Sequence, residues 1–410
     1  MKYSKEEVIQ YVQEEDVKFI RLAFCDVFGK QKNVSIMPDE LPRAFEHGIA
    51  FDASSIAGFG SESHSDLYLH PDPDTLIPLP WRPEHGSVVR MFADITYPDG
   101  TPFECDTRFL LKQAVAEAEK AGYSFSFGAE QEFYLFRLDD RGEPTKIPYD
   151  HAGYMDIAPD DRGENIRREI CLMLEQMGIR PESSHHEDGP GQNEIDFRYS
   201  DALTAADNAE TFQTVVRIVA QRNGIAADFS AKPLKDSPGN GFHINISVSP
   251  PENRERMNCM IAGILDRIRE ITVFLNPGRN SFDRFGQNRA PQYISWSEQN
   301  RSQLIRIPAA EGPFRRAEVR SPDPEANPYL AFLLLIHAGL EGLEKNAELP
   351  PAVNVNLYTA DREVLEKLDR LPGSRKEARA AALASDFVRR HIPEPIIRIF
   401  CQDDGPSAGK

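Results

Sequence analysis

A run of apolar residues interrupted by two acids constrains the fold of this chain more than any other segment. Residues 127–136 read FGAEQEFYLF, which is typical of a buried strand except for Glu130 and Glu132. An ionised carboxylate that leaves water costs several kcal/mol unless it is paired or binds a metal. Residues two apart in a strand share a face, so both acids point the same way. The fold must therefore supply cationic groups opposite this face.

Three further segments carry polar side chains that fit such a face. In FHINIS, residues 242–247, the polar alternate positions are His243, Asn245 and Ser247. In RRAEVRS, residues 315–321, they are Arg316, Glu318 and Arg320. The segment SSHHEDGPGQNEIDF, residues 183–197, adds histidines and acids around a Gly-Pro-Gly turn: His185, His186, Glu187 and Glu194. Alternation of polar and apolar residues predicts strands whose polar faces meet.

Each motif alone has an ordinary structural explanation. Two acids in a strand are usually solvated, a single strand histidine usually belongs to the core, and an Arg-Glu-Arg pattern is usually a surface ion-pair ladder. Their joint occurrence favours one shared site. Carboxylates with a single imidazole suit Mg²⁺ or Mn²⁺ better than zinc. Arginines beside such a metal neutralise charge during phosphoryl transfer. Neither a GxxxxGK[ST] loop nor a GxGxxG fingerprint is present.

Composition and charge narrow the possible partners. The chain has 410 residues, with no apolar run long enough to cross a bilayer and no signal-peptide pattern at its start. Its formal net charge of −18 argues against nucleic acid or anionic membrane as a partner. The five cysteines lie far apart and form no CxxC pair, which fits a reducing compartment. We therefore expect a cytoplasmic protein that binds neither nucleic acid nor membrane.

The order of predicted strands and helices indicates an α+β protein with two domains. The turn-rich segment YPDGTPFECD, residues 97–106, precedes a new helical pattern, FLLKQAVAEAEKAG, and is the best boundary candidate. We place a small N-terminal domain at residues 1–103 and a large domain at residues 104–410. A long buried helix is predicted at NPYLAFLLLIHAGLEGLEKN, and the periodicity weakens after residue 371.

Six segments, taken in order, resemble class I glutamine synthetase. They are FDASSIAGF, GAEQEFYLF, SHHEDGPGQNEIDFRY, GNGFHINIS, NRSQLIRIP and RRAEVRSPDPEANPYLA. The resemblance implies a small N-terminal β-grasp-like domain and a catalytic domain with a curved antiparallel sheet and helices. It also implies a homo-hexamer or homo-dodecamer with active sites between subunits. Such enzymes use ATP to phosphorylate the side-chain carboxylate of glutamate, and ammonia then displaces the phosphate.

The resemblance also implies ATP as a substrate and two or three Mg²⁺ or Mn²⁺ ions. The residues that match the ligands of one metal are Glu132, Glu187 and Glu194. Those that match the ligands of the second metal, beside the ATP phosphates, are Glu130, His243 and Glu318. The positions that match nucleotide contacts are Asn245, Ser247, Arg306 and Arg316.

The remaining assignments by resemblance concern glutamate and ammonia. The positions that match glutamate-binding residues are Arg284, Arg320 and Gly239, and Arg301 matches a catalytic arginine that contacts phosphate. The ammonium pocket would consist of Tyr154, Glu187 and, from the adjacent subunit, Asp52. The Asp52 carboxylate would hold ammonium and help to take a proton from it.

Two departures from the family pattern bear on the substrates. In DRFGQNRAP, residues 283–291, Arg289 stands where the family's flap loop has a glutamate, and a cation there is expected to repel ammonium. In SPGNGFH, residues 237–243, Pro238 stands where the family usually has an asparagine beside the bound glutamate.

Three hypotheses about function follow. The first is a glutamine synthetase, which is favoured because Asp52, Tyr154 and Glu187 are all present. The second is a relative that joins glutamate, or another carboxylate, to a polyamine or another amine, and Arg289 and Pro238 motivate it. The third is a non-catalytic regulatory homologue. That hypothesis predicts the loss of metal-binding and phosphate-binding residues, whereas all six metal-ligand positions carry suitable side chains.

Overall fold

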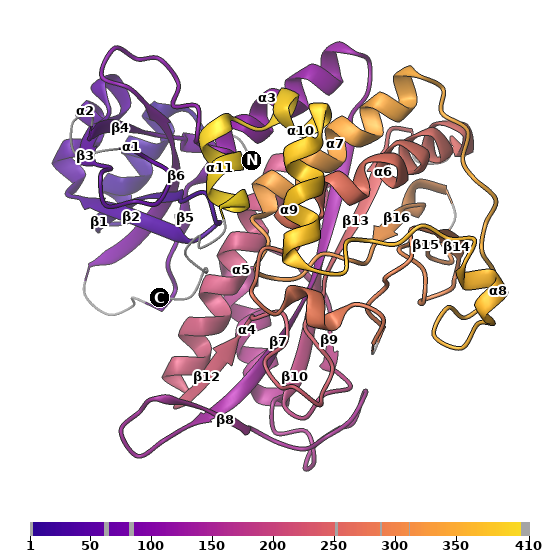
Figure 1. Cartoon of the computed structure of the whole chain (residues 1–410). Helices are drawn as coiled ribbons and strands as arrows, with labels where there is room; N and C mark the ends of the chain where they lie inside the picture. The colour runs from indigo at the N-terminus through magenta and orange to yellow at the C-terminus, as the bar shows by residue number, and fades with distance from the viewer. Residues whose placement is uncertain are drawn as a thin grey trace. The chain divides into compact units, whose positions relative to one another are not determined.

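The computed structural model describes residues 3–60, 65–81, 86–250, 253–287, 289–310 and 312–402. The chain divides into two compact units, one of residues 1–110 and 172–179 and the other of residues 111–171 and 180–410 (Figure 1). The predicted boundary between residues 103 and 104 stays a prediction. Among the described residues, none of the helices is both long and apolar enough to cross a membrane.

The N-terminal unit is built on a six-stranded sheet with the order β2-β1-β6-β4-β3, and β5 also pairs with β6. Strand β1 runs parallel to β6, whereas the other pairs are antiparallel. Helix α1 packs against β1 and α2, and α2 packs against β4. The elements are α1 (Lys5–Glu14), β1 (Val17–Cys25), β2 (Gln31–Ile36), α2 (Leu41–His47), β3 (Ile49–Asp52), β4 (Asp66–Pro71), β5 (Ile77–Pro78) and β6 (Ser87–Thr96), with 3-10 turns at Pro38–Glu40 and Pro73–Thr75.

The larger unit is built on a ten-stranded sheet with the order β14-β15-β16-β13-β7-β10-β9, and β8, β11 and β12 also pair with β7. All its pairs are antiparallel except β14 with β15. Its strands are β7 (Phe125–Leu138), β8 (Pro144–Pro148), β9 (Pro181–His186), β10 (Gln192–Phe197), β11 (Ser200–Asp201), β12 (Ile225–Asp228), β13 (Phe242–Val248), β14 (Trp296–Glu298), β15 (Ile305–Ile307) and β16 (Ala317–Val319).

Helices accompany this sheet along the chain. Helix α3 (Thr107–Lys120) leads into the larger unit, and the predicted long helix is α7 (Pro328–Glu344). The others are α4 (Glu164–Gln176), α5 (Ala202–Arg222), α6 (Arg254–Leu275), α8 (Arg362–Leu365), α9 (Arg375–Ala384), α10 (Asp386–His391) and α11 (Glu394–Cys401), with 3-10 turns at Ser281–Arg284 and Gly312–Phe314.

Strand β7 has one face against helices and one face toward polar groups. Phe127 stacks on Phe332 of α7 with ring centroids 4.3 Å apart, and Phe133 meets Phe212 of α5 edge to face at 6.0 Å. Each aromatic pair of this kind contributes about 0.5–1.5 kcal/mol beyond its buried area. Because side chains alternate along a strand, this packing leaves Glu130 and Glu132 on the opposite face.

The segment after residue 371 contains more regular structure than the weak periodicity predicted. Helices α9 and α10 each begin at a serine whose side chain accepts a backbone N–H: Ser374 from Glu377, and Ser385 from Val388. Such caps stabilise helices as short as these, because the first turn otherwise has unpaired N–H groups. Phe400 of α11 packs against Phe274 of α6, with ring centroids 5.0 Å apart.

Helices α6 and α7 cross so closely that only glycine fits at their contact. A Cβ atom added at Gly263 would lie 2.2 Å from the carbonyl oxygen of Ala338 and 2.8 Å from the Cα atom of Gly342. Gly263→Ala should therefore push the helices apart and lower the free energy of unfolding by about 1–3 kcal/mol. Denaturant unfolding of the purified protein would measure this.

The matched control is Gly373→Ala. An added Cβ atom there meets nothing closer than the Glu377 carboxylate oxygen at 3.8 Å, so its stability should stay near that of the wild type. Equal stability of both variants would contradict the close crossing.

Candidate active site

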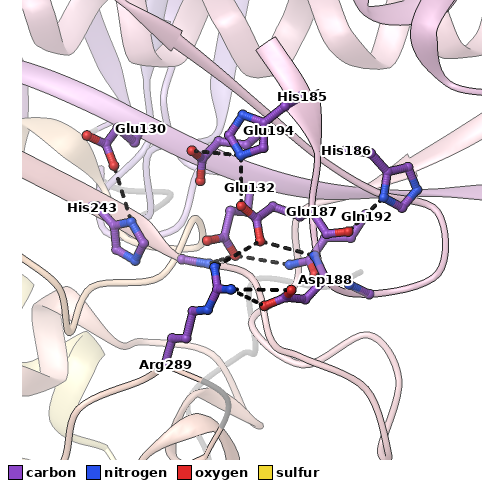
Figure 2. Close-up of polar contacts among 12 residues, drawn as sticks. Glu130, Glu132, His185, His186, Glu187, Asp188, Gln192, Glu194, His243 and Arg289 are labelled. Atoms are coloured by element: carbon purple, nitrogen blue, oxygen red, sulfur yellow. Dashed lines mark hydrogen bonds and ion pairs between the residues drawn. The ribbon is translucent and has the colours of Figure 1, made fainter. Parts of the chain in front are cut away.

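The register of three neighbouring strands brings the predicted acids together. In the pairing of β7 with its neighbours, Glu130 lies opposite Asp196 of β10 and His243 of β13. Two residues further along β7, on the same face, Glu132 lies opposite Glu194 of β10. Residues directly opposite in an antiparallel pair have adjacent side chains on the same face. The sheet therefore concentrates carboxylates and one imidazole in two adjacent rows, and Figure 2 shows Glu130 pointing toward His243.

A third row, from β13 across β16 to β15, brings arginines beside these acids. Asn245 lies opposite Glu318, and Glu318 lies opposite Arg306. Asn245 links the rows, because its amide donates to Glu130 at 2.7 Å while its carbonyl oxygen accepts from Arg316 Nε at 2.9 Å. Polar side chains that were predicted on separate strands thus form one hydrogen-bonded surface.

A cavity of about 540 Å³ opens on this surface. The predicted site residues that line it are Glu130, Glu132, Tyr154, Glu187, Glu194, Gly239, His243, Arg284, Arg301, Arg306, Arg316 and Arg320. Four others do not line it. Asn245, Ser247 and Glu318 are buried residues of the same sheet, and Asp52 belongs to the N-terminal unit.

Two overlapping groups of side chains could hold a cation. Ligand atoms of Glu130, Glu194 and His243 lie within 4.8 Å of one another, as do those of His185, Glu187 and Glu194. These groups divide the residues differently from the sets that the resemblance implies, because Glu194 joins both and His185 takes part. Hard oxygen ligands with one imidazole each are the donors that Mg²⁺ and Mn²⁺ accept. The donor sets therefore fit divalent cations of this kind.

The electrostatics of these acids point to a missing positive charge. Burial raises the pKa of Glu194 well above its ordinary value, and the charges of Asp196, Glu132, Glu130 and Glu187 raise it further. Burial and the Glu130 charge raise the pKa of Asp196 to about 7. Burial also raises the pKa of Glu132, although His243 opposes the shift. Crowded buried carboxylates favour protonation until a cation joins them.

Glu318 is the exception, because arginines surround it. Burial alone would raise its pKa, but Arg320, His243 and Arg306 hold it at about 2. Arg306 donates to one carboxylate oxygen at 2.6 Å, and Arg320 donates to the other. His243 Nδ1 lies 3.7 Å from the same carboxylate. Glu318 is therefore ionised and fixes two arginines that line the cavity.

Elsewhere in the cavity, Glu187 lies beside a histidine and an arginine. Burial raises its pKa, but the hydrogen bond with His185, 2.9 Å long, and the Arg289 charge lower it below its ordinary value. The rings of His185 and Tyr154 also meet edge to face, with centroids 5.5 Å apart. Glu187 is consequently an ionised acid beside an aromatic ring.

Arg284 approaches the cavity past a glycine. It is buried, donates to the Ser321 carbonyl oxygen at 3.1 Å and lies 3.9 Å from Asp323. A Cβ atom at Gly239 would lie 2.5 Å from Arg284 Cγ, so this position needs glycine for the arginine to reach the site. A buried arginine that lines a cavity suits a carboxylate ligand.

A third group of possible ligands already has protein partners for its charged atoms. Asp150 accepts from His186 at 2.9 Å and from the N–H groups of Arg162 and Gly191, while Asp161 forms an ion pair with Arg167. His186 also donates to the Glu187 carbonyl oxygen at 2.7 Å. This buried network supports the backbone at Glu187 instead of binding a metal.

Several residues that line the cavity had no role predicted from the sequence, among them Asp188, Gln192 and Asp196. His185 was predicted only as one of the polar side chains around the Gly-Pro-Gly turn, without a place in either metal set. The alternation in QNEIDF contained a signal for two of them, because Gln192, Glu194 and Asp196 share one face of β10. Gln192 donates to Glu132 at 3.0 Å and so orients that acid.

Comparison with known proteins agrees with this geometry. The family model described as glutamine synthetase, catalytic domain, matches residues 104–403, and the model described as glutamine synthetase, beta-Grasp domain, matches residues 16–98. The chain belongs to the glutamine synthetase family. The family and the fold predicted from the sequence are thus confirmed.

Curated relatives in this family match nearly the whole chain. A glutamine synthetase of Methanosarcina mazei is 45% identical over 96% of this chain and 91% of the relative. One of Clostridium saccharobutylicum is 44% identical over 92% of this chain and 88% of the relative.

Solved structures share the architecture. A structure titled GmaS/ADP complex-Conformation 1 has a TM-score of 0.87 at 27% identity, covering 96% of this chain and 94% of that one. A Plasmodium falciparum glutamine synthetase has a TM-score of 0.85 at 21% identity, covering 98% of this chain and 95% of that one, and it supports the fold alone.

The crowding of carboxylates predicts how the protein responds to metal. Glu194→Gln removes one of several buried like charges, so the metal-free variant should be more stable than the wild type at neutral pH by about 1–3 kcal/mol. Saturating Mg²⁺ or Mn²⁺ should raise the melting temperature of the wild type, because binding at about 100 times Kd contributes about 2.7 kcal/mol. In the variant this shift should be much smaller.

Thermal unfolding with and without metal, after treatment with a chelator, measures both effects. The control is Glu344→Gln at the exposed end of α7, which should respond to metal like the wild type. A Glu194→Gln protein with the full metal-induced shift would contradict the site.

Proposed function

We propose that this enzyme forms glutamine from glutamate, ammonia and ATP through a γ-glutamyl phosphate intermediate. One observation carries the proposal: a single cavity joins a cluster of carboxylates to several arginines in a chain of the glutamine synthetase family. Phosphoryl transfer between two anions needs such fixed positive groups. All six predicted metal-ligand residues are present and five of them line the cavity, which disfavours the non-catalytic hypothesis.

The proposed metals are two or three Mg²⁺ or Mn²⁺ ions. The residues that would hold them are Glu130, Glu132, His185, Glu187, Glu194 and His243, with Glu318 close to His243. When bound, the metals supply the positive charge that offsets repulsion between ATP and the glutamate carboxylate. The raised pKa values of Glu132 and Glu194 support this assignment, because these acids lack sufficient compensation from the protein alone.

The arginines divide into two proposed groups. Arg301, Arg306 and Arg316, which line the cavity, face the phosphates. Asn245 and Ser247 of β13 do not line it, so their contribution to the nucleotide site is indirect: Asn245 accepts from Arg316 at 2.9 Å. Arg284 and Arg320, with the backbone at Gly239, bind glutamate and direct its side-chain carboxylate toward ATP. Arg320 lines the cavity and donates a hydrogen bond to Glu318. Because Glu318 orients it, its position does not depend on substrate.

The proposed acceptor pocket combines residues of two subunits. Tyr154 and Glu187 come from one chain, and Asp52 comes from its neighbour. Asp52 ends β3 and is exposed, and its carboxylate accepts the N–H of Ser54 at 2.8 Å. Hydrogen bonds from Ser54 lower its pKa, so it is ionised and suited to a cation. This pocket requires an oligomer, for which we propose a hexamer or dodecamer.

The cellular setting is a further part of the proposal. No disulfide joins cysteines within the described part of the chain, which supports a reducing cytoplasm. The proposed partners are small molecules and other copies of this chain.

A second candidate function is ligation of glutamate to an amine other than ammonia. The observation in its favour is Arg289, whose guanidinium lies 3.9 Å from Glu187 and 4.7 Å from the Tyr154 ring centroid. A cation at that position changes what the acceptor pocket can hold.

A panel of amines separates these two candidates. Purified enzyme with ATP, Mg²⁺ and glutamate should release phosphate and form glutamine when ammonia is the acceptor, because an acyl phosphate reacts with the nucleophile held beside it. Phosphate release and the amide product are measured for ammonia, alkylamines and polyamines. A product with another amine and none with ammonia would overturn the proposal in favour of the second candidate.

Co-expression of inactive variants tests whether the active site is shared. Asp52→Ala and Glu187→Ala subunits should each be inactive alone, since each removes one side of the acceptor pocket. In mixed oligomers, some sites combine the intact Asp52 of one subunit with the intact Glu187 of another, so activity should return.

The control pair is Glu130→Ala with Glu187→Ala. Both residues line the cavity of one chain, so every site in the mixture carries a defect and activity should stay absent. Recovery in the control pair, or none in the first pair, would rule out a site shared in this way.

A further inference from the structure

Arg289 contacts the same two residues that the proposed function assigns to the acceptor. Its guanidinium lies over the Tyr154 ring, 4.7 Å from the centroid, and 3.9 Å from the Glu187 carboxylate. Figure 2 shows the arginine reaching toward Glu187 and Asp188. An aromatic face with an ionised carboxylate at its edge is a site for a small cation. In this structure, the protein's own side chain provides that cation.

The backbone directs Arg289 into this position. The residue has φ of +69°, an uncommon conformation for a side chain other than glycine, at the end of a tight turn. The turn is closed by N–H groups of Gly286 and Ala290, which donate to Ala290 and Gln287 at 2.9 Å each. Arg320 also donates to the Arg289 carbonyl oxygen at 3.4 Å. Several contacts thus hold the backbone from which the guanidinium extends.

Asp188 is a second acidic partner of the guanidinium. Its carboxylate lies 3.0 Å from Arg289, closer than the 3.9 Å of Glu187. Both side chains are partly open to solvent, with 38% of Arg289 and 35% of Asp188 exposed, whereas Glu187 is only 9% exposed. Arg289 can therefore leave Glu187, keep its ion pair with Asp188 and move outward.

We propose that Arg289 is a displaceable internal competitor of the acceptor amine. Its guanidinium fills the cation position between Tyr154 and Glu187, and the acceptor cation must displace it outward, with the ion pair to Asp188 kept. Arg289 is then a specificity-determining residue whose side chain weakens binding of ammonium, while its contact with the proposed glutamate position is made by its backbone carbonyl oxygen alone. The inference rests on the proposed function in one respect, that Tyr154 and Glu187 hold the acceptor.

Arg289→Gln tests the competition. The variant keeps a polar side chain but removes the cation, so the KM for ammonium should fall by about threefold to tenfold, the factor expected for one cation–π contact and one partly exposed ion pair. The KM values for glutamate and ATP should stay unchanged. The control is Arg362→Gln on the exposed surface of α8, which removes the same charge and should leave all three constants unchanged.

Added guanidinium ion distinguishes occupation of the position from a general effect of charge. At millimolar concentration it should inhibit Arg289→Gln competitively against ammonium, because it re-enters the vacated position, and it should inhibit the wild type far less. An unchanged KM for ammonium in Arg289→Gln, or equal inhibition of both proteins by guanidinium, would overturn the inference. Failure of the wild type to form glutamine would instead count against the proposed function.

Discussion

Repulsion among carboxylates on the central strands is the constraint on which the rest of the larger unit depends. Glu130 and Glu132 on β7, with Glu194 and Asp196 on β10, are brought together by register and cannot separate without breaking the sheet. These four acids can stay ionised together only if cations from elsewhere in the sequence lie beside them. The arginines that line the same cavity belong to β15, to the two flanks of β16 and to the 3-10 turn at Ser281–Arg284: Arg306, Arg316, Arg320 and Arg284. The remaining deficit of positive charge is what divalent metals would fill.

The cations differ in how firmly the protein holds them. Arg306 and Arg320 are fixed by Glu318, which remains ionised because of them. The backbone of Arg289 is held by a tight turn, whereas its guanidinium is held only by partly exposed ion pairs. Positions of the first kind suit groups that must stay in place during phosphoryl transfer. A position of the second kind suits a group that yields to a ligand. One cavity thus combines firmly held arginines, at the proposed phosphate and glutamate positions, with a less firmly held arginine at the proposed acceptor position.

Alternation along the strands was enough to predict the faces of β7, β13 and β16, because burial on one side and charge on the other leave a period-two pattern. The partners of each acid depend on register, which alternation does not specify, so Asp196 was missed opposite Glu130. The short helices after residue 371 depend on caps at Ser374 and Ser385 and on packing with α6. The contact of Arg289 with Asp188 depends on turn geometry, which had no signal in the sequence.

The central position of β7 has a consequence for how the protein acquires its chemistry. The strand pairs with β10, residues 192–197, and with β13, residues 242–248. Strand β16, which carries Glu318 and ends at residue 319, pairs in turn with β13 and extends the polar surface. A shift of β7 by one residue would turn its acids into the layer of helices. Affinity for metal is therefore a property of the completed sheet. A polypeptide that is still being synthesised gains it only when β10, β13 and β16 have paired with the earlier strand β7.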